Sequence, residues 1–279
     1  MKVRLWGTRG SIATPGPETT RYGGNTSCVE VRGRDGDLVV LDAGTGIRRL
    51  GATIGPEAQR IDLLLTHLHL DHIEGLGFFG PLFRRDLEVH IWGPASTTLD
   101  LRARLTRLLS PPLFPVRLRD LPCKLELHDL SSIERFQVGS LEVRSALVCH
   151  PGPTVGFRIS EGDVSLAYLS DHEPAFGAVD FPNDLDWTSG FEIAADADLL
   201  IHDAQYDDDE YAGRVGWGHS SLRDALAFAE AARARRVIPY HYDPGHTDED
   251  LDERFERAHG DAPLPFELLP ALEGASFEL

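Results

Sequence analysis

The sequence predicts an α/β fold built from layers of strands and helices, because strand-like and helical patterns alternate along the whole chain. Apolar or alternating runs, which are typical of strands, occur in the first half at Lys2–Thr8 and Ile61–Leu65. They return in the second half at Val164–Leu169 and Arg236–Tyr240. Between these last two runs, apolar residues recur with the spacing of one helix face and predict an amphipathic helix over Ser221–Arg235.

Length and composition agree with a folded domain that has a sizeable core. The chain has 279 residues, of which 42% are hydrophobic, and we expect one domain over residues 1–279. Its three cysteines cannot form a disulfide framework, which indicates a reducing environment. The N-terminal segment MKVRLWGTRG lacks the apolar core of a signal peptide, and no apolar run approaches the ~18 residues of a membrane span. We therefore expect a cytoplasmic protein.

The net charge of the chain bears on its partners. Acidic residues number 45 against 27 basic residues, so the formal net charge is −18. This charge disfavours attraction to DNA, RNA and anionic lipid, because all three are polyanions. It is compatible with a small anionic molecule held by metal. We therefore expect a small anionic substrate, with nucleic acid disfavoured and no membrane partner.

One basic stretch departs from the acidic character of the chain. Residues 101–119 contain no acid and five arginines, namely Arg102, Arg104, Arg107, Arg117 and Arg119. The plain interpretation is a solvated helix face whose arginine stems lie along apolar surface. The functional alternatives are a rim that attracts phosphate and a contact between the two chains of a homodimer.

The segment after the apolar strand Ile61–Leu65 carries the strongest chemical signal. Six consecutive residues, from His67 to His72, contain three histidines and one aspartate in the pattern HxHxDH. Burying such groups together is costly unless something pairs them, and imidazole and carboxylate are preferred ligands of zinc and similar divalent ions. His67 and His69 alternate along extended chain and can point the same way. Asp71 and His72 then lie where a helix begins and can serve a second ion nearby.

This motif resembles that of the metallo-β-lactamase superfamily, in which further ligands follow later strands. Matching residues are His150 in VCHPGP, Asp171 in AYLSDHE and His241 in VIPYHYDP. The resemblance implies a four-layered αβ/βα sandwich. It also implies two divalent metal ions per chain, with zinc expected first and manganese or iron as alternatives. The implied ligands are His67, His69 and His150 for one ion, Asp71, His72 and His241 for the second, and Asp171 as a bridge between them.

Further residues match the superfamily in supporting or catalytic roles. Asp42, in VVLDAGTG, matches its first aspartate motif, which implies that this carboxylate accepts the outer N–H of a ligand imidazole. His219, in WGHSSLRDALAF, resembles the His-Ser-Thr segment of the phosphodiesterase branch, which includes ribonuclease Z and cyclic-nucleotide phosphodiesterases. The resemblance implies that His219 and Asp71 take part in catalysis, with His219 beside the scissile phosphate. Asp203, in LLIHDAQY, is a candidate to orient His219.

The resemblance implies a metal-dependent hydrolase, and first of all a phosphodiesterase acting on a small phosphodiester such as a cyclic nucleotide. Only 20 residues separate His150 from Asp171, and no other long insertion offers the arm with which ribonuclease Z grips tRNA. Two alternatives stay open. One is an exonuclease or endonuclease of the ribonuclease Z-like branch, and the other is an acyl hydrolase of the same fold that cleaves a thioester or lactone.

Overall fold

The computed structural model describes residues 1–178, 185–260 and 263–279. Within these residues the strands form two mixed sheets of seven strands each. The first sheet has the order β14 (Ser276–Glu278), β1 (Lys2–Gly7), β2 (Cys28–Arg32), β3 (Leu38–Leu41), β4 (Arg60–Leu64), β5 (Glu88–Pro94), β6 (Lys124–Leu130). The second has the order β13 (Glu267–Leu268), β12 (Arg236–Tyr240), β11 (Leu199–Asp203), β10 (Val164–Leu169), β9 (Val155–Glu161), β8 (Leu141–Leu147), β7 (Ile133–Val138).

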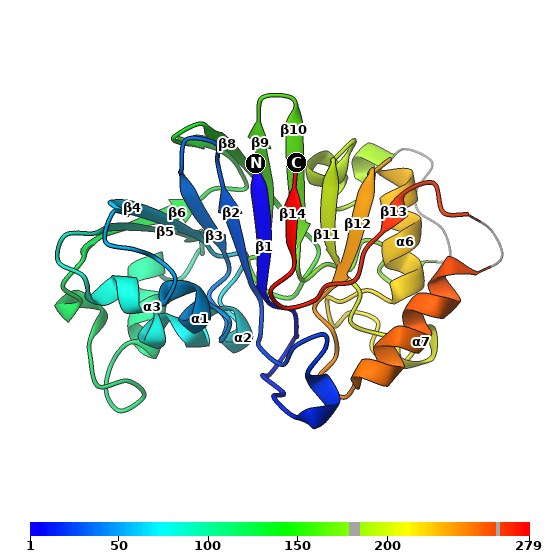
Figure 1. Cartoon of the computed structure of the whole chain (residues 1–279), viewed down its shortest axis with the longest axis horizontal. Coiled ribbons are helices and arrows are strands. Elements are labelled where there is room, and N and C mark those ends of the chain that lie inside the picture. The colour runs from blue at the N-terminus through cyan, green and yellow to red at the C-terminus, as the bar shows by residue number, and fades with distance from the viewer. Residues whose placement is uncertain (179–184, 261–262) are drawn as a thin grey trace.

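Helices connect the strands and cover the outer faces of the sheets. The α-helices are α1 (Ile47–Gly51), α2 (Leu70–Ile73), α3 (Leu101–Leu108), α4 (Phe191–Ala194), α5 (Asp208–Tyr211), α6 (Leu222–Ala231) and α7 (Asp248–His259). Short 3-10 helices are η1 (Pro17–Thr19), η2 (Glu74–Phe78), η3 (Gly80–Phe83), η4 (Leu118–Asp120) and η5 (Leu185–Trp187). In Figure 1 α1–α3 lie on the left with strands β3–β6, α6 and α7 lie on the right with strands β11–β13, and the two termini lie side by side in the middle.

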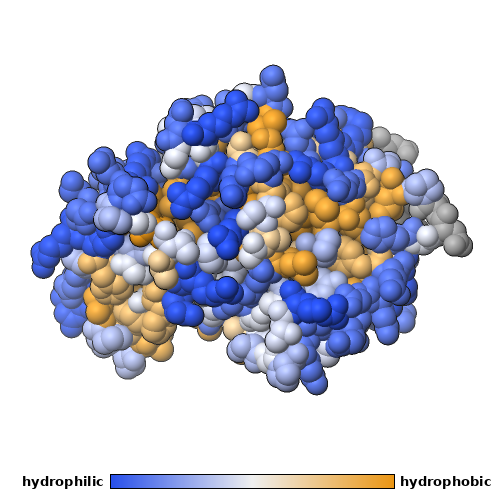
Figure 2. All heavy atoms as spheres, viewed as in Figure 1, coloured by the Kyte–Doolittle hydropathy of each residue, from blue (hydrophilic) through white to orange (hydrophobic). Residues whose placement is uncertain are grey.

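Apolar side chains fill the spaces between these layers. Val31 of β2 and Phe157 of β9 belong to the core between the two sheets. Behind the first sheet, Leu50 of α1 and Leu105 of α3 belong to a second cluster, and behind the second sheet Phe228 of α6 belongs to a third. Polar side chains cover most of the face seen in Figure 2. The order helix, sheet, sheet, helix confirms the predicted four-layered αβ/βα sandwich.

The direction of the strands explains how distant segments reach one edge. Strands β3 to β6 run parallel in the first sheet, and β10 to β13 run parallel in the second. Carboxyl ends of parallel neighbours lie at the same edge of a sheet, and ligand sites form there. The loops that follow β4, β10, β11 and β12 therefore leave the sheets at the edge where α2 lies, at the bottom of Figure 1.

The predicted amphipathic helix is present as α6 but is shorter than its apolar pattern suggested. It spans Leu222–Ala231 rather than Ser221–Arg235. Ser221 is the residue that caps it, because the Ser221 hydroxyl oxygen accepts a hydrogen bond from the Asp224 backbone N–H. At the other end Arg233 has a φ of 54°, in the left-handed region, which ends the helix before Arg235.

No helix in the described ranges is both long and apolar enough to cross a membrane. That residues 1–279 form one domain, and that the protein is cytoplasmic, stay predictions.

The Tyr240→Phe substitution tests how the two sheets are tied together. The buried Tyr240 hydroxyl of β12 donates to the Gly7 carbonyl of β1 and accepts from the Cys28 N–H of β2, 3.1 Å away. Removing the hydroxyl leaves two buried backbone groups unpaired, so the free energy of unfolding should fall by about 1–3 kcal/mol. Urea denaturation measures it, and a loss below about 0.5 kcal/mol, the size of an ordinary surface substitution, would contradict the assignment.

Candidate metal centre

The seven predicted ligands meet at the edge where the parallel strands end. His67, His69, Asp71 and His72 follow β4, and His150 lies in the loop after β8. Asp171 and His241 follow β10 and β12. Their ligand atoms form overlapping groups within 4.8 Å of one another: His67 with His69 and His150, His67 with His72 and Asp171, and Asp71 with His72 and His241.

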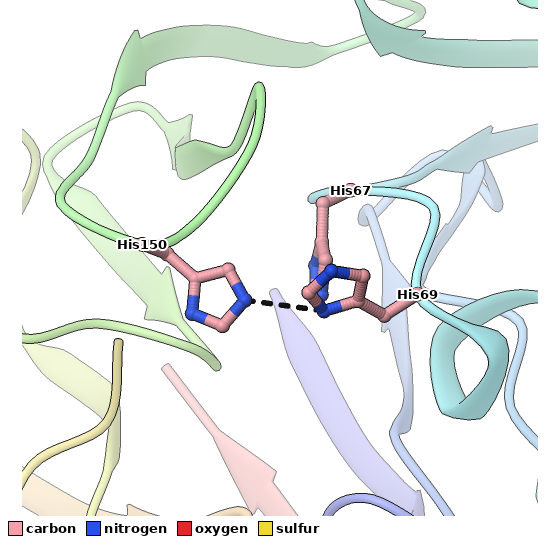
Figure 3. Close-up of side chains that lie close together, drawn as sticks. All are labelled: His67, His69 and His150. Atoms are coloured by element: carbon pink, nitrogen blue, oxygen red, sulfur yellow. Dashed lines mark hydrogen bonds between the residues drawn. The ribbon is translucent and has the colours of Figure 1, made fainter. Parts of the chain in front are cut away.

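The first group, His67, His69 and His150, comes from two loops that lie opposite each other. Figure 3 shows His67 and His69 from the loop after β4 opposite His150 from the loop after β8, with their rings turned toward one another. His69 Nδ1 lies 3.2 Å from His150 Nε2. The His67 and His150 ring centroids are 4.8 Å apart.

The second group lies beside the first, and Asp171 lies between them. His72 Nε2 is 3.0 Å from one Asp171 oxygen, and His241 Nε2 is 3.3 Å from the other. That same second oxygen is 3.7 Å from His67 Nε2 in the first group. Asp71 completes the second group, with Oδ2 3.2 Å from His241 Nε2. Asp171 is therefore the one carboxylate that reaches donors of both groups within the described residues.

A buried donor atom without a partner indicates that the site fits metal. His67 Nε2 is buried and makes no hydrogen bond to any described residue, and the buried Asp171 Oδ1 faces His72 Nε2 at 3.0 Å. Buried polar atoms are normally satisfied, so an atom left unpaired at the meeting point of histidines and aspartates suits a cation. Burial also lowers the pKa of the His67, His69 and His150 imidazoles, which favours the neutral form that binds metal. That these residues bind metal stays a prediction.

Oxygen atoms behind the site orient the predicted ligand rings. The Asp42 carboxylate lies 2.9 Å from His72 Nδ1 and is itself held by Tyr168 and Thr66. Asp42 has a φ of 58°, in the left-handed region that an L-residue rarely adopts. With Nδ1–H donating to Asp42, His72 would present an Nε2 lone pair to a metal ion at the centre. Asp42 thus lies where it can set the tautomer of His72.

Two similar contacts involve residues that the sequence did not single out. Gln205 Oε1 lies 3.2 Å from His241 Nδ1, and the Gly218 carbonyl oxygen lies 2.9 Å from His150 Nδ1. Neither residue carries a motif that could have identified it. Gln205 is close only because it follows β11, and Gly218 only because its loop folds back over His150.

His219 lies at the rim of the centre and is paired with Asp203. His219 Nδ1 is 2.7 Å from Asp203 Oδ2 and 3.9 Å from Asp171 Oδ2. Its ring stacks on His241, with centroids 5.0 Å apart. Burial favours the neutral imidazole, but the Asp203 and Asp171 carboxylates outweigh it and raise the pKa of His219 to about 9. The two carboxylates therefore favour the protonated imidazole, and the hydrogen bond to Asp203 is made by Nδ1 rather than Nε2.

Glu173 is a further buried group that the sequence did not indicate. Its carboxylate accepts hydrogen bonds from the Gly216 and Gly218 N–H groups, at 2.8 and 2.7 Å, and from the Tyr211 hydroxyl. It thereby fixes the loop that supplies the Gly218 carbonyl to His150. Gly218 has a φ of 92°, and a Cβ there would lie 2.2 Å from His150 Nδ1, so the close approach requires glycine.

Comparison with known proteins relates this arrangement to a family. The sequence model of the beta-lactamase superfamily domain matches residues 38–242. A ribonuclease Z from Haloarcula marismortui is 26% identical in an alignment that covers 95% of this chain and 94% of that protein. Human tRNase Z, short form, has a TM-score of 0.69 at 22% identity, with 100% of this chain and 99% of that chain covered. A diphosphatase from the PhnP family has a TM-score of 0.70 at 18% identity, with 100% and 97% covered.

The expectation that nucleic acid is disfavoured as a partner is wrong, because relatives along almost the whole chain are ribonucleases. Net charge sums over the entire surface, whereas a nucleic acid meets the charge around one site. The chain also has local cationic surface despite its charge of −18. In the described structure Arg102, Arg107 and Arg117 are exposed, whereas Arg104 pairs with Asp129.

The matched range contains all seven predicted ligands, and also Asp42, Asp203 and His219. A ribonuclease and a diphosphatase are both hydrolases, and the prediction of a metal-dependent hydrolase is confirmed. The chain belongs to the β-lactamase superfamily and has the metallo-β-lactamase fold.

Proposed function

We propose that this chain is a phosphodiesterase with a dinuclear metal centre, and that its substrate is RNA. The observation that carries the proposal is the His219–Asp203 pair, 2.7 Å apart, at the rim of a cluster of five imidazoles and two carboxylates, all buried except His69. Hydrolysis of a phosphodiester is helped by cations that offset the negative charge of the phosphoryl oxygens and by a proton for the leaving oxygen. The ribonuclease Z relatives support RNA over a small phosphodiester such as a cyclic nucleotide.

The chain's own side chains divide into two candidate sets of metal ligands. His67, His69 and His150 would hold one ion, while Asp71, His72 and His241 would hold the other, with Asp171 contacting both. Zinc suits this donor set best, because it accepts both imidazole and carboxylate ligands. Two such ions would supply positive charge to the phosphoryl oxygens and lower the pKa of the attacking water.

His219 would act on the leaving group. Its Nδ1–H donates to Asp203, which fixes the ring and leaves the Nε2 proton available for the leaving oxygen. Asp203 is held in turn by the backbone N–H groups of Ser220 and Gln205, both 3.0 Å away. The pair is therefore organised before substrate binds.

Asp71 would help to orient the attacking water. Its Oδ2 accepts the Ser11 backbone N–H at 2.7 Å, so a residue of the N-terminal loop fixes this carboxylate. Ser11 has a φ of 62°, and this unusual conformation points its N–H at Asp71.

Removing metal should abolish turnover. Protein purified without chelator is expected to contain about two metal ions per chain and to hydrolyse bis-p-nitrophenyl phosphate and a short RNA. Dialysis against chelator should remove both the metal and the activity, and added zinc should restore them. Metal analysis and a turnover assay measure this, with a thioester as the control for acyl hydrolysis. Substantial turnover by metal-free protein would contradict the proposal, as would cleavage of the thioester alone.

Replacing His219 should lower the turnover of substrates with poor leaving groups most. The His219→Ala variant is expected to lose about 10²–10⁴-fold in kcat on RNA, whose leaving alkoxide needs a proton. The loss on bis-p-nitrophenyl phosphate should be much smaller, because p-nitrophenolate leaves without one. His259→Ala, at an exposed position near the end of α7, is the matched control and should keep wild-type rates. Equal losses on the two substrates would show that His219 is not the proton donor.

A further inference from the structure

We propose that Trp217 forms a stacking platform for a nucleobase next to the scissile phosphodiester. This rests on the proposed RNA phosphodiesterase function and adds a base-binding subsite to it. The Trp217 side chain is 60% exposed, although tryptophan is among the side chains that gain most from burial. An exposed aromatic ring beside a phosphodiester site is what single-stranded nucleic acids stack on.

The position of Trp217 in the chain places it at the catalytic rim. It precedes Gly218, whose carbonyl oxygen lies 2.9 Å from His150 Nδ1, and it is two residues before His219. The His150 and His219 rings are 5.1 Å apart. A phosphate in contact with His219 would therefore have its neighbouring nucleoside within reach of the Trp217 ring.

The backbone on both sides of Trp217 is fixed. Glu173 accepts the N–H groups of Gly216 and Gly218, and the Trp217 N–H donates to the Arg214 carbonyl at 3.0 Å. Both glycines have positive φ, 86° and 92°, so the loop shape depends on them. A platform that is ordered before binding loses little entropy when a base stacks on it.

The surroundings of Trp217 favour a nucleotide over a purely apolar partner. The same loop carries Arg214, whose guanidinium lies 4.8 Å from the centre of the Tyr206 ring. The Tyr206 ring in turn meets His219 edge-on. An arginine and an exposed tryptophan on one short loop offer a cation to a phosphate and a flat face to a base. Phe176, 61% exposed, lies near Gly216 and widens the apolar face.

The test compares Trp217→Ala and Trp217→Phe with wild type on two substrates. One is a short RNA, and the other is the same RNA with an abasic nucleotide on either side of the cleaved bond. Trp217→Ala should raise KM for the intact RNA about 5- to 150-fold, the range expected for loss of one stacked base. The kcat should change little, and Trp217→Phe should restore most of the affinity. On the abasic RNA the variants and wild type should have similar KM values.

Controls separate failure of this subsite from failure of the proposed function. Phe83→Ala removes an exposed aromatic ring from η3 and should leave KM unchanged. Suppose that wild type cleaves RNA but that Trp217→Ala keeps KM within twofold, or raises KM equally on both RNAs. The base-binding subsite is then refuted, whereas the proposed phosphodiesterase activity is not. If Trp217→Ala changes the sedimentation coefficient instead of KM, the ring belongs to a protein contact and the subsite is overturned. If wild type cleaves no RNA, both proposals fail together.

Discussion

The arrangement at the site depends on one buried carboxylate that is shared by two sets of donors. Asp171 lies between the His67 group and the His241 group, and its two oxygens face imidazole nitrogens of both groups. In a protein interior such a cluster is costly unless positive charge compensates it. The fold accepts this cost at the end of β10, where both sheets and their loops converge.

Around this carboxylate the structure is organised in successive shells of hydrogen bonds. Several of the rings that face the centre are oriented from behind by an oxygen atom, for example Asp42 behind His72 and Gln205 behind His241. Farther out, Glu173 fixes the loop that orients His150 and leads to His219. The left-handed backbone at Asp42 and at His241 helps to position both side chains, because each residue turns the chain sharply as its strand ends. These hydrogen bonds hold the rings of the site in place from behind.

That these seven residues lie together was predictable, because four of them are close in sequence and the others follow predicted strands. The HxHxDH pattern follows an apolar strand, and isolated polar residues follow later strands, so the edge of the sandwich was the natural meeting point. Glu173, Gln205 and Gly218 were not predictable, since their roles depend on tertiary contacts that leave no pattern in the sequence. The half-exposed strands β6 and β7 were also not predictable, because edge strands lack the continuous apolar run of a buried strand. Net charge misled the choice of partner, because it averages over surfaces that never meet the substrate.

Anomalous X-ray diffraction from crystals grown without chelator tests the central claim most directly. Two metal peaks are expected about 3.5–4 Å apart, one within bonding distance of His67, His69 and His150 and the other of Asp71, His72 and His241. Asp171 should contact both. A single peak, or peaks bound by other residues with this cluster metal-free, would contradict it.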